Sequence, residues 1–204
     1  MGGMQIRPFR PTDRDACYDV CVRTGLAGGD ATGAYSDDSL TPDIFCGPYL
    51  ELEPDLAFVI DDGERAVGYV LGAHDTADFV ARYRAQWLPG FERRHPLRDD
   101  ASADEREMLD LGYRPERMLT RDLEEYPAHL HIDLLPSAQG HGLGRALMTT
   151  LLEALTRRGI PGVHLEMDPA NTGALRFYEK LGFTRLEAEE PDSLRMGLRL
   201  PAAS

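Results

Sequence analysis

A glycine-rich run at residues 139–145, QGHGLGR, constrains the fold of this chain more than any other part of the sequence. It follows the apolar stretch 130–135 and leads into Ala146-Leu147-Met148, which predicts a strand, a tight loop and the first turn of a helix. Glycines let the backbone turn sharply and approach a ligand closely. The first N–H groups of a helix have no partner inside the helix and point outward from its end. The run therefore predicts a binding site for a phosphorylated ligand.

The sequence excludes two common phosphate-binding motifs. A dinucleotide fingerprint that begins at Gly140 requires glycine or alanine at position 145, where this chain has Arg145. The Walker A string G-x-x-x-x-G-K-[ST] does not occur in the sequence. The pattern that remains is Q-x-x-G-x-G, from Gln139 to Gly144.

A second pattern lies further along the chain. Apolar and polar residues alternate over 163–168, which predicts a strand. Asn171 then offers a helix N-cap, and Gly182 a helix end. Between them one apolar stripe has helical spacing, made of Ala174, Phe177, Tyr178 and Leu181. The pattern predicts a strand followed by a short amphipathic helix.

The Q-x-x-G-x-G loop and the string N-x-x-A-x-x-F-Y-x-K-L-G-F at 171–183 resemble the two signatures of the GNAT superfamily of N-acetyltransferases, in the expected order. The resemblance covers roughly residues 128–185. It implies an α/β fold with a central, mixed, twisted sheet of about seven strands, splayed between strands four and five, and helices on both faces. It also implies acetyl-CoA as the co-substrate. The six histidines show no metal-ligand spacing, so we expect no metal.

Hydrophobic periodicity predicts the remaining elements. We expect strands at 5–9, 57–61, 66–73, 128–135, 163–168 and 193–200, and helices at 12–23 and 143–158. Thr12 and Asp15 have the spacing of a capping box at the start of the first helix. The glycine-rich segment 25–33 is suited to a loop on the substrate side of the site.

The stretch 76–126 is too long for a simple connection between the third and fourth strands. We expect a single domain over residues 1–204, with this stretch as an insertion. With Trp87-Leu88-Pro89 and Tyr126-Pro127, it resembles the acetyltransferase-like domain at the C-terminus of O-GlcNAcases and its free-standing bacterial relatives. We expect its aromatic side chains, Phe79, Tyr83 and Trp87, to cover the acceptor side of the cleft.

The resemblance also implies which residues contact the coenzyme. In GNAT enzymes the coenzyme arm adds to strand four like an extra strand, which assigns backbone contacts to Ile132, Asp133 and Leu134. The Ile132 N–H would polarise the acetyl carbonyl. The other implied contacts come from the glycine run and the later helix: Gln139, Gly140, His141, Gly142, Leu143, Gly144, Arg145, Asn171 and Tyr178.

Tyr178 stands where the family places its general acid, and a phenol of pKa ~10 can donate a proton to a nascent thiolate. A strand-four glutamate base would fall near position 128, which is Ala128 here. Asp133 is the predicted base, although in a regular strand it points to the face opposite Ile132. The alternatives that stay open are Asp30, Asp75, Asp168, His131 and an ordered water. We expect His129 and His131 to be solvated or hydrogen-bonded.

Charge and composition limit the partners. The formal net charge of −13 argues against nucleic-acid binding and favours an amine-bearing acceptor. No apolar run approaches the ~20 residues that span a bilayer. The sequence has three cysteines and no C-x-x-C, which favours a reducing compartment, so we expect a cytoplasmic protein. A homodimer is left open.

The sequence thus predicts an acetyl-CoA-dependent N-acetyltransferase, with direct attack of a primary amine of a small molecule or peptide in a ternary complex. The alternative is a non-catalytic acyl-CoA-binding module, as in multidomain relatives in which the glycine loop is degraded. The loop is intact here, which favours coenzyme binding.

Overall fold

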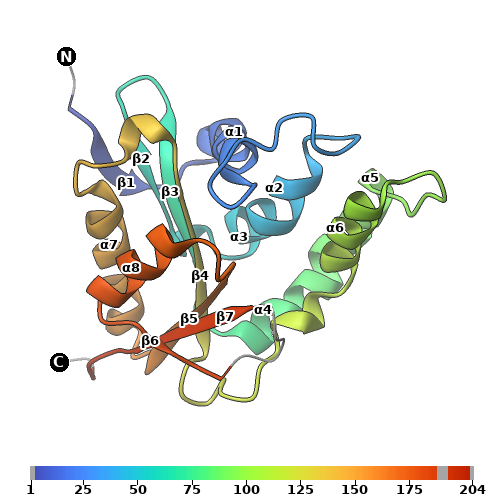
Figure 1. Cartoon of the computed structure of the whole chain (residues 1–204). Helices are drawn as coiled ribbons and strands as arrows, with labels where there is room; N and C mark the ends of the chain where they lie inside the picture. Colours follow the sequence, from blue (N-terminus) through green and yellow to red (C-terminus); the bar gives the residue numbers. More distant parts are fainter. Residues whose placement is uncertain (1–2, 188–192, 203–204) are drawn as a thin grey trace.

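The computed structural model of the chain, which describes residues 3–187 and 193–202, has a mixed sheet at its centre (Figure 1). Within those ranges the sheet has seven strands in the order β1-β2-β3-β4-β5-β7-β6. All neighbours are antiparallel except β4 and β5. The strands are β1 (Gln5–Pro8), β2 (Ala57–Asp61), β3 (Ala66–Ala73), β4 (Ala128–Leu134), β5 (Gly162–Met167), β6 (Thr184–Arg185) and β7 (Leu194–Arg199). The predicted α/β fold is confirmed.

Helices cover both faces of the sheet. On one face lie α1 (Arg14–Thr24), α2 (Leu40–Phe45), α3 (Gly47–Leu52) and the short turn η2 (Pro54–Leu56). The buried residues Cys17, Val20 and Cys21 form the inner stripe of α1, so these two cysteines are core residues. On the other face α7 (Leu143–Arg157) brings Leu151 against Gly72 of β3. Beside α7 lies α8 (Thr172–Lys180), as Figure 1 shows.

The first helix begins differently from the prediction. The chain forms a 3₁₀ turn, η1 (Pro11–Asp13), before α1. The N-cap residue of α1 is Asp13. Its Oδ2 accepts the Arg10 N–H at 2.8 Å, and its carboxylate pairs with Arg7 of β1. The predicted capping box of Thr12 and Asp15 is therefore wrong, because an arginine on the neighbouring strand holds Asp13 at the helix start.

The insertion is helical throughout most of its length. It contains α4 (Thr76–Arg82), the π-helical turn η3 (Tyr83–Trp87), α5 (Leu88–Arg94), α6 (Ala103–Tyr113) and the 3₁₀ turn η4 (Pro115–Met118). It packs against α2 and α3: the Trp87 indole donates to the Asp43 carbonyl at 2.9 Å, and Phe79 stacks on Tyr49 with centroids 4.5 Å apart. These aromatic side chains therefore extend the hydrophobic core.

Candidate active site

The strands β4 and β5 separate soon after they meet. They pair at Ala128↔Val163 and His129↔His164 and at no later position of the two strands. Residues 130–134 of β4 therefore have an edge that faces no neighbouring strand on the β5 side. An extended ligand can add to such an edge through backbone hydrogen bonds.

Backbone groups of Ile132 and Leu134 point into this gap. The Leu135 N–H donates to the Val67 carbonyl at 2.9 Å, the position opposite it in β3. Because hydrogen-bonded and non-bonded pairs alternate along antiparallel strands, the backbone of Asp133 is bonded to β3, whereas Ile132 and Leu134 face away from it. The predicted backbone contact at Asp133 is therefore wrong. The backbone groups of Ile132 and the Leu134 N–H face the gap, where the Leu134 carbonyl accepts from Gln139.

The glycine run turns sharply between the 3₁₀ turn η5 (Pro136–Ala138) and α7. The Gln139 amide donates to the Leu134 carbonyl at 2.9 Å and anchors the start of the loop to β4. Gly140 and Gly142 have φ of 79° and 76°, a conformation that costs a residue with a Cβ roughly 1–2 kcal/mol. Gly142 is the N-cap of α7 and offers no side-chain cap, so the first N–H groups of α7 stay available to an anion.

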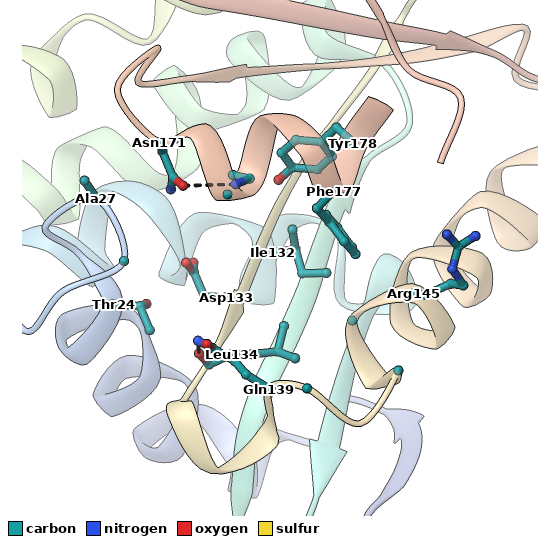
Figure 2. A pocket seen from close by; sticks show the side chains of 16 residues that line it. Thr24, Ala27, Ile132, Asp133, Leu134, Gln139, Arg145, Asn171, Phe177 and Tyr178 are labelled. Carbon is teal, nitrogen blue, oxygen red and sulfur yellow. Dashed lines mark hydrogen bonds between the residues drawn. The ribbon is translucent and has the colours of Figure 1, made fainter. Parts of the chain in front are cut away.

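A cavity of about 620 Å³ joins the loop to the gap between β4 and β5 (Figure 2). Its lining comprises Thr24, Ala27, Gly28, Ile132, Asp133, Leu134, Gln139, Gly140, Gly142, Gly144, Arg145, Asn171, Gly173, Ala174, Phe177 and Tyr178. Two predicted coenzyme contacts are not among them. The His141 side chain is exposed, and Leu143 packs against the core, so neither side chain lines the cavity.

Tyr178 enters the cavity from α8. The helix begins at Asn171, whose Oδ1 accepts the Ala174 N–H at 3.0 Å, as the sequence predicts. Tyr178 is 8% exposed and its ring contacts Phe177 and Phe183. Burial, with a smaller effect of the Asp133 charge, raises the pKa of Tyr178 well above that of a free phenol. Its hydroxyl therefore carries a proton throughout the physiological range.

Asp133 lies on the face of the sheet that α1 covers, as expected for a strand whose register has no bulge. Its Oδ2 accepts the Tyr69 hydroxyl at 2.7 Å. It nevertheless lines the same cavity as Tyr178, because the cavity passes through the gap and reaches Thr24 at the end of α1. Figure 2 shows its carboxylate directed into the cavity. Burial raises the pKa of Asp133, which makes it a better proton acceptor than an exposed aspartate.

The other base candidates lie outside this cavity. Asp75 caps α4 by accepting the Asp78 N–H, Asp168 accepts the Ala170 N–H, and Asp30 accepts from Thr32. His131 bonds to Tyr49, and burial lowers its pKa to about 4. Among the described residues that line the cavity, Asp133 is the only acid and Arg145 the only arginine or lysine.

The acceptor side of the cavity differs from the prediction. None of Phe79, Tyr83 and Trp87 lines it, so the expectation that these aromatic residues cover the cleft is wrong. They are buried against α2 and α3, contacts that their spacing along the chain could not reveal. The glycine-rich loop does contribute, through Ala27 and Gly28. Thr24 was missed because nothing in its local sequence marks it.

The position of Trp87 gives a test of this correction. Trp87 is the only tryptophan, is 4% exposed and bonds to the Asp43 carbonyl. We expect saturating acetyl-CoA to leave its emission maximum unchanged in a fluorescence titration. A shift that saturates with the coenzyme would show that the insertion responds to the cavity.

One acidic cluster in the described ranges has the spacing of a metal site. Ligand atoms of Glu53, His74 and Asp78 lie within 4.8 Å of one another. The guanidinium of Arg82 pairs with both carboxylates, through Nη2 to Glu53 and through Nε to Asp78. In this structure the cluster is an ion-pair network around Arg82. Over the same ranges, no helix has the length and apolarity needed to cross a bilayer.

Comparison with known proteins agrees with this geometry. The profile of the Acetyltransferase (GNAT) family matches residues 27–183. Protein O-GlcNAcase of Rattus norvegicus is 26% identical over 201 residues, which cover 96% of this chain and 22% of that protein. A mycothiol acetyltransferase of Thermomonospora curvata is 58% identical over 50 residues, which cover 24% of this chain and 17% of that protein. The chain thus spans about a fifth of the length of these curated relatives.

Two solved structures share the fold. SsHAT is 50% identical with a TM-score of 0.91, over 97% of this chain and 98% of its own. The protein yncA of Salmonella typhimurium, solved with acetyl-CoA, is 16% identical with a TM-score of 0.60, over 100% of this chain and 97% of its own.

Proposed function

Because this chain belongs to the GNAT acetyltransferase family, we propose that it transfers an acetyl group from acetyl-CoA to a primary amine by direct attack in a ternary complex. The observation that carries the proposal is one cavity in which a free strand edge, a protonated phenol and a carboxylate of raised pKa meet. The glycine loop at its mouth has the N–H groups that a pyrophosphate requires.

Each group has one role in the transfer. The Ile132 N–H donates to the acetyl carbonyl oxygen, where negative charge develops as the amine nitrogen attacks the carbonyl carbon. Asp133 accepts the proton that the attacking nitrogen loses. Tyr178 donates its proton to the sulfur as the carbon–sulfur bond breaks. Proton exchange with solvent then restores both side chains.

Release of the coenzyme thiol tests the proposal. The chain is incubated with acetyl-CoA and a panel of small amines and peptides, and free thiol is measured with and without each amine. Amine-dependent thiol together with a matching acetylated product supports transfer. Coenzyme binding without amine-dependent thiol, for every amine tested, would identify a binding module instead.

The loop geometry gives a separate prediction for binding. We expect Gly142→Leu to weaken acetyl-CoA binding at least about tenfold, because the side chain would fill the space in front of the α7 N–H groups and remove charge-assisted hydrogen bonds. Calorimetry measures the dissociation constant. Gly159→Leu is the matched control, since Gly159 also has a left-handed φ and open space but lies at the other end of α7. Equal affinity in both variants would contradict the assignment of the loop.

A further inference from the structure

A second, smaller cavity of about 50 Å³ continues along the same edge of β4. It is lined by residues 129–131 of β4, whereas residues 132–134 line the larger cavity of about 620 Å³ that we assign to acetyl-CoA. Residues 164–166 of β5 form its other side, and Tyr49 of α3, Arg195 of β7 and residues 117, 118 and 120 complete it. A molecule in this cavity would therefore lie next to the acetyl site at Ile132.

Arg195 is the least expected residue in this lining. It is 1% exposed, and its guanidinium donates through Nη2 to Asp122 at 2.6 Å and to Thr120 at 2.9 Å, and through Nη1 to the Glu187 carbonyl at 3.1 Å. Its Nε–H is buried without a hydrogen-bond partner among the described residues. A buried donor that lacks an acceptor is costly, more so when it is charged. Such a donor indicates an acceptor group that arrives with a ligand.

Arg117 supplies a second guanidinium from the end of η4, at the exposed side of the cavity. The acids near the cavity are Asp122, which pairs with Arg195, and Glu166, which is exposed at the rim. Burial lowers the pKa values of His129, His131 and His164, so these rings are neutral at neutral pH. Asp122 offsets the charge of Arg195, so the charged donors that the described lining still offers are the Arg117 guanidinium and the unpartnered Nε–H of Arg195, and charged donors favour a carboxylate.

Hydrogen bonds fix the tautomer of His131. The Thr76 hydroxyl donates to the Pro127 carbonyl at 2.7 Å, so it accepts from His129 Nδ1 at 2.8 Å. His129 Nε2 must then accept the Tyr49 hydroxyl at 2.8 Å, and Tyr49 in turn accepts from His131 Nε2 at 3.0 Å. His131 therefore carries its proton on Nε2 and presents Nδ1 as an acceptor, which suits the N–H groups of an amine.

We propose that this second cavity binds the carboxylate of the acceptor, and that the acceptor is an amino acid or a similar small zwitterion. This inference rests on the proposed acetyl transfer. The Arg117 guanidinium and the Arg195 Nε–H hold the carboxylate, and His131 Nδ1 orients the amine beside Ile132. A space of 50 Å³ exceeds what a single water requires and suits a head group of a few atoms.

The test compares each standard amino acid that has a primary α-amine with its carboxamide as the acceptor, at saturating acetyl-CoA. The amine of the amide is less basic, so a larger fraction of it is unprotonated and able to attack. An enzyme that does not recognise the carboxylate would therefore favour the amide. We expect kcat/KM to favour at least one free acid over its amide by about tenfold to a hundredfold. An enzyme that accepts amides equally well, or that prefers amines without a carboxylate, overturns the inference.

Arg117→Gln tests the clamp directly, because Arg117 is exposed and the variant should fold. We expect its kcat/KM to fall by about tenfold to a hundredfold for the preferred amino acid and to change little for the amide. The control is Arg157→Gln, which removes an exposed arginine from α7 on the other face of the sheet. Equal losses for acid and amide would contradict the clamp.

A measurement without turnover separates this inference from the proposed function. Calorimetry of the chain saturated with coenzyme A is carried out with each amino acid. If no amine is ever acetylated, the proposed function fails. An amino acid that binds the wild-type protein, and binds Arg117→Gln at least about tenfold less tightly, would still support the subsite. No binding, or equal binding to both proteins, would refute the subsite.

Discussion

Tyr178→Phe is expected to lower kcat by about 10²–10⁴ and to leave the affinity for acetyl-CoA nearly unchanged. Phenylalanine keeps the ring and its contacts with Phe177 and Phe183, but removes the hydroxyl that faces the cavity. A proton donated only as the thiol leaves affects the transition state and not the bound ground state. The measurement is steady-state kinetics with an accepting amine, together with calorimetry of coenzyme binding.

Tyr126→Phe is the matched control for this variant. Tyr126 is also 8% exposed, but it packs against Gly162 and Gly197 and does not line the cavity. We expect it to retain the wild-type kcat. If Tyr178→Phe retained it as well, Tyr178 would be only a core residue, and another group would have to protonate the thiolate.

Asp133→Asn is expected to lower kcat/KM by about 10²–10⁴, because asparagine cannot accept the proton of the amine. It should also change the pH profile. In the wild type, activity falls as the pH falls through the pKa of Asp133, which burial raises above the value of an exposed aspartate. The acid limb should therefore lie at a higher pH than ~4, the ordinary pKa of aspartate, and should disappear in the variant.

Denaturant unfolding of Asp133→Asn shows whether its loss of activity comes from loss of the folded state. A carboxyl whose pKa is higher in the folded state favours the folded protein below its unfolded pKa, and this contribution disappears as the pH rises through the folded pKa. At neutral pH the ionised form is therefore a cost, so Asp133→Asn should not lower the midpoint of denaturant unfolding. The amide oxygen of the introduced asparagine can still accept the Tyr69 hydroxyl. Asp168→Asn, at a position outside the cavity, should retain activity.

The glycine run and the Asn171 cap could be predicted because they depend on neighbours in the chain. Two left-handed glycines, an uncapped α7 and the bond from Asn171 to Ala174 each involve residues only a few positions apart. The same locality explains why the apolar stripe correctly predicted the helix α8, on which Tyr178 is the buried residue. The residues within each of these segments favour the same local structure that the folded chain adopts there.

What the sequence by itself determined is therefore the strand, loop and helix that would receive the coenzyme, together with the helix that carries Tyr178. Tertiary structure decided the acceptor side, since its contacts join residues far apart in the chain. Tyr69 of β3 donates to Asp133 of the neighbouring strand β4, the Trp87 indole bonds to Asp43, and Arg117 and Arg195 line one cavity. The separation of β4 from β5 after two residue pairs is likewise a property of the assembled sheet. The pleat of β4 directs the Asp133 side chain to the face that α1 covers. Asp133 still lines the cavity, because the gap between β4 and β5 opens on both faces of the sheet.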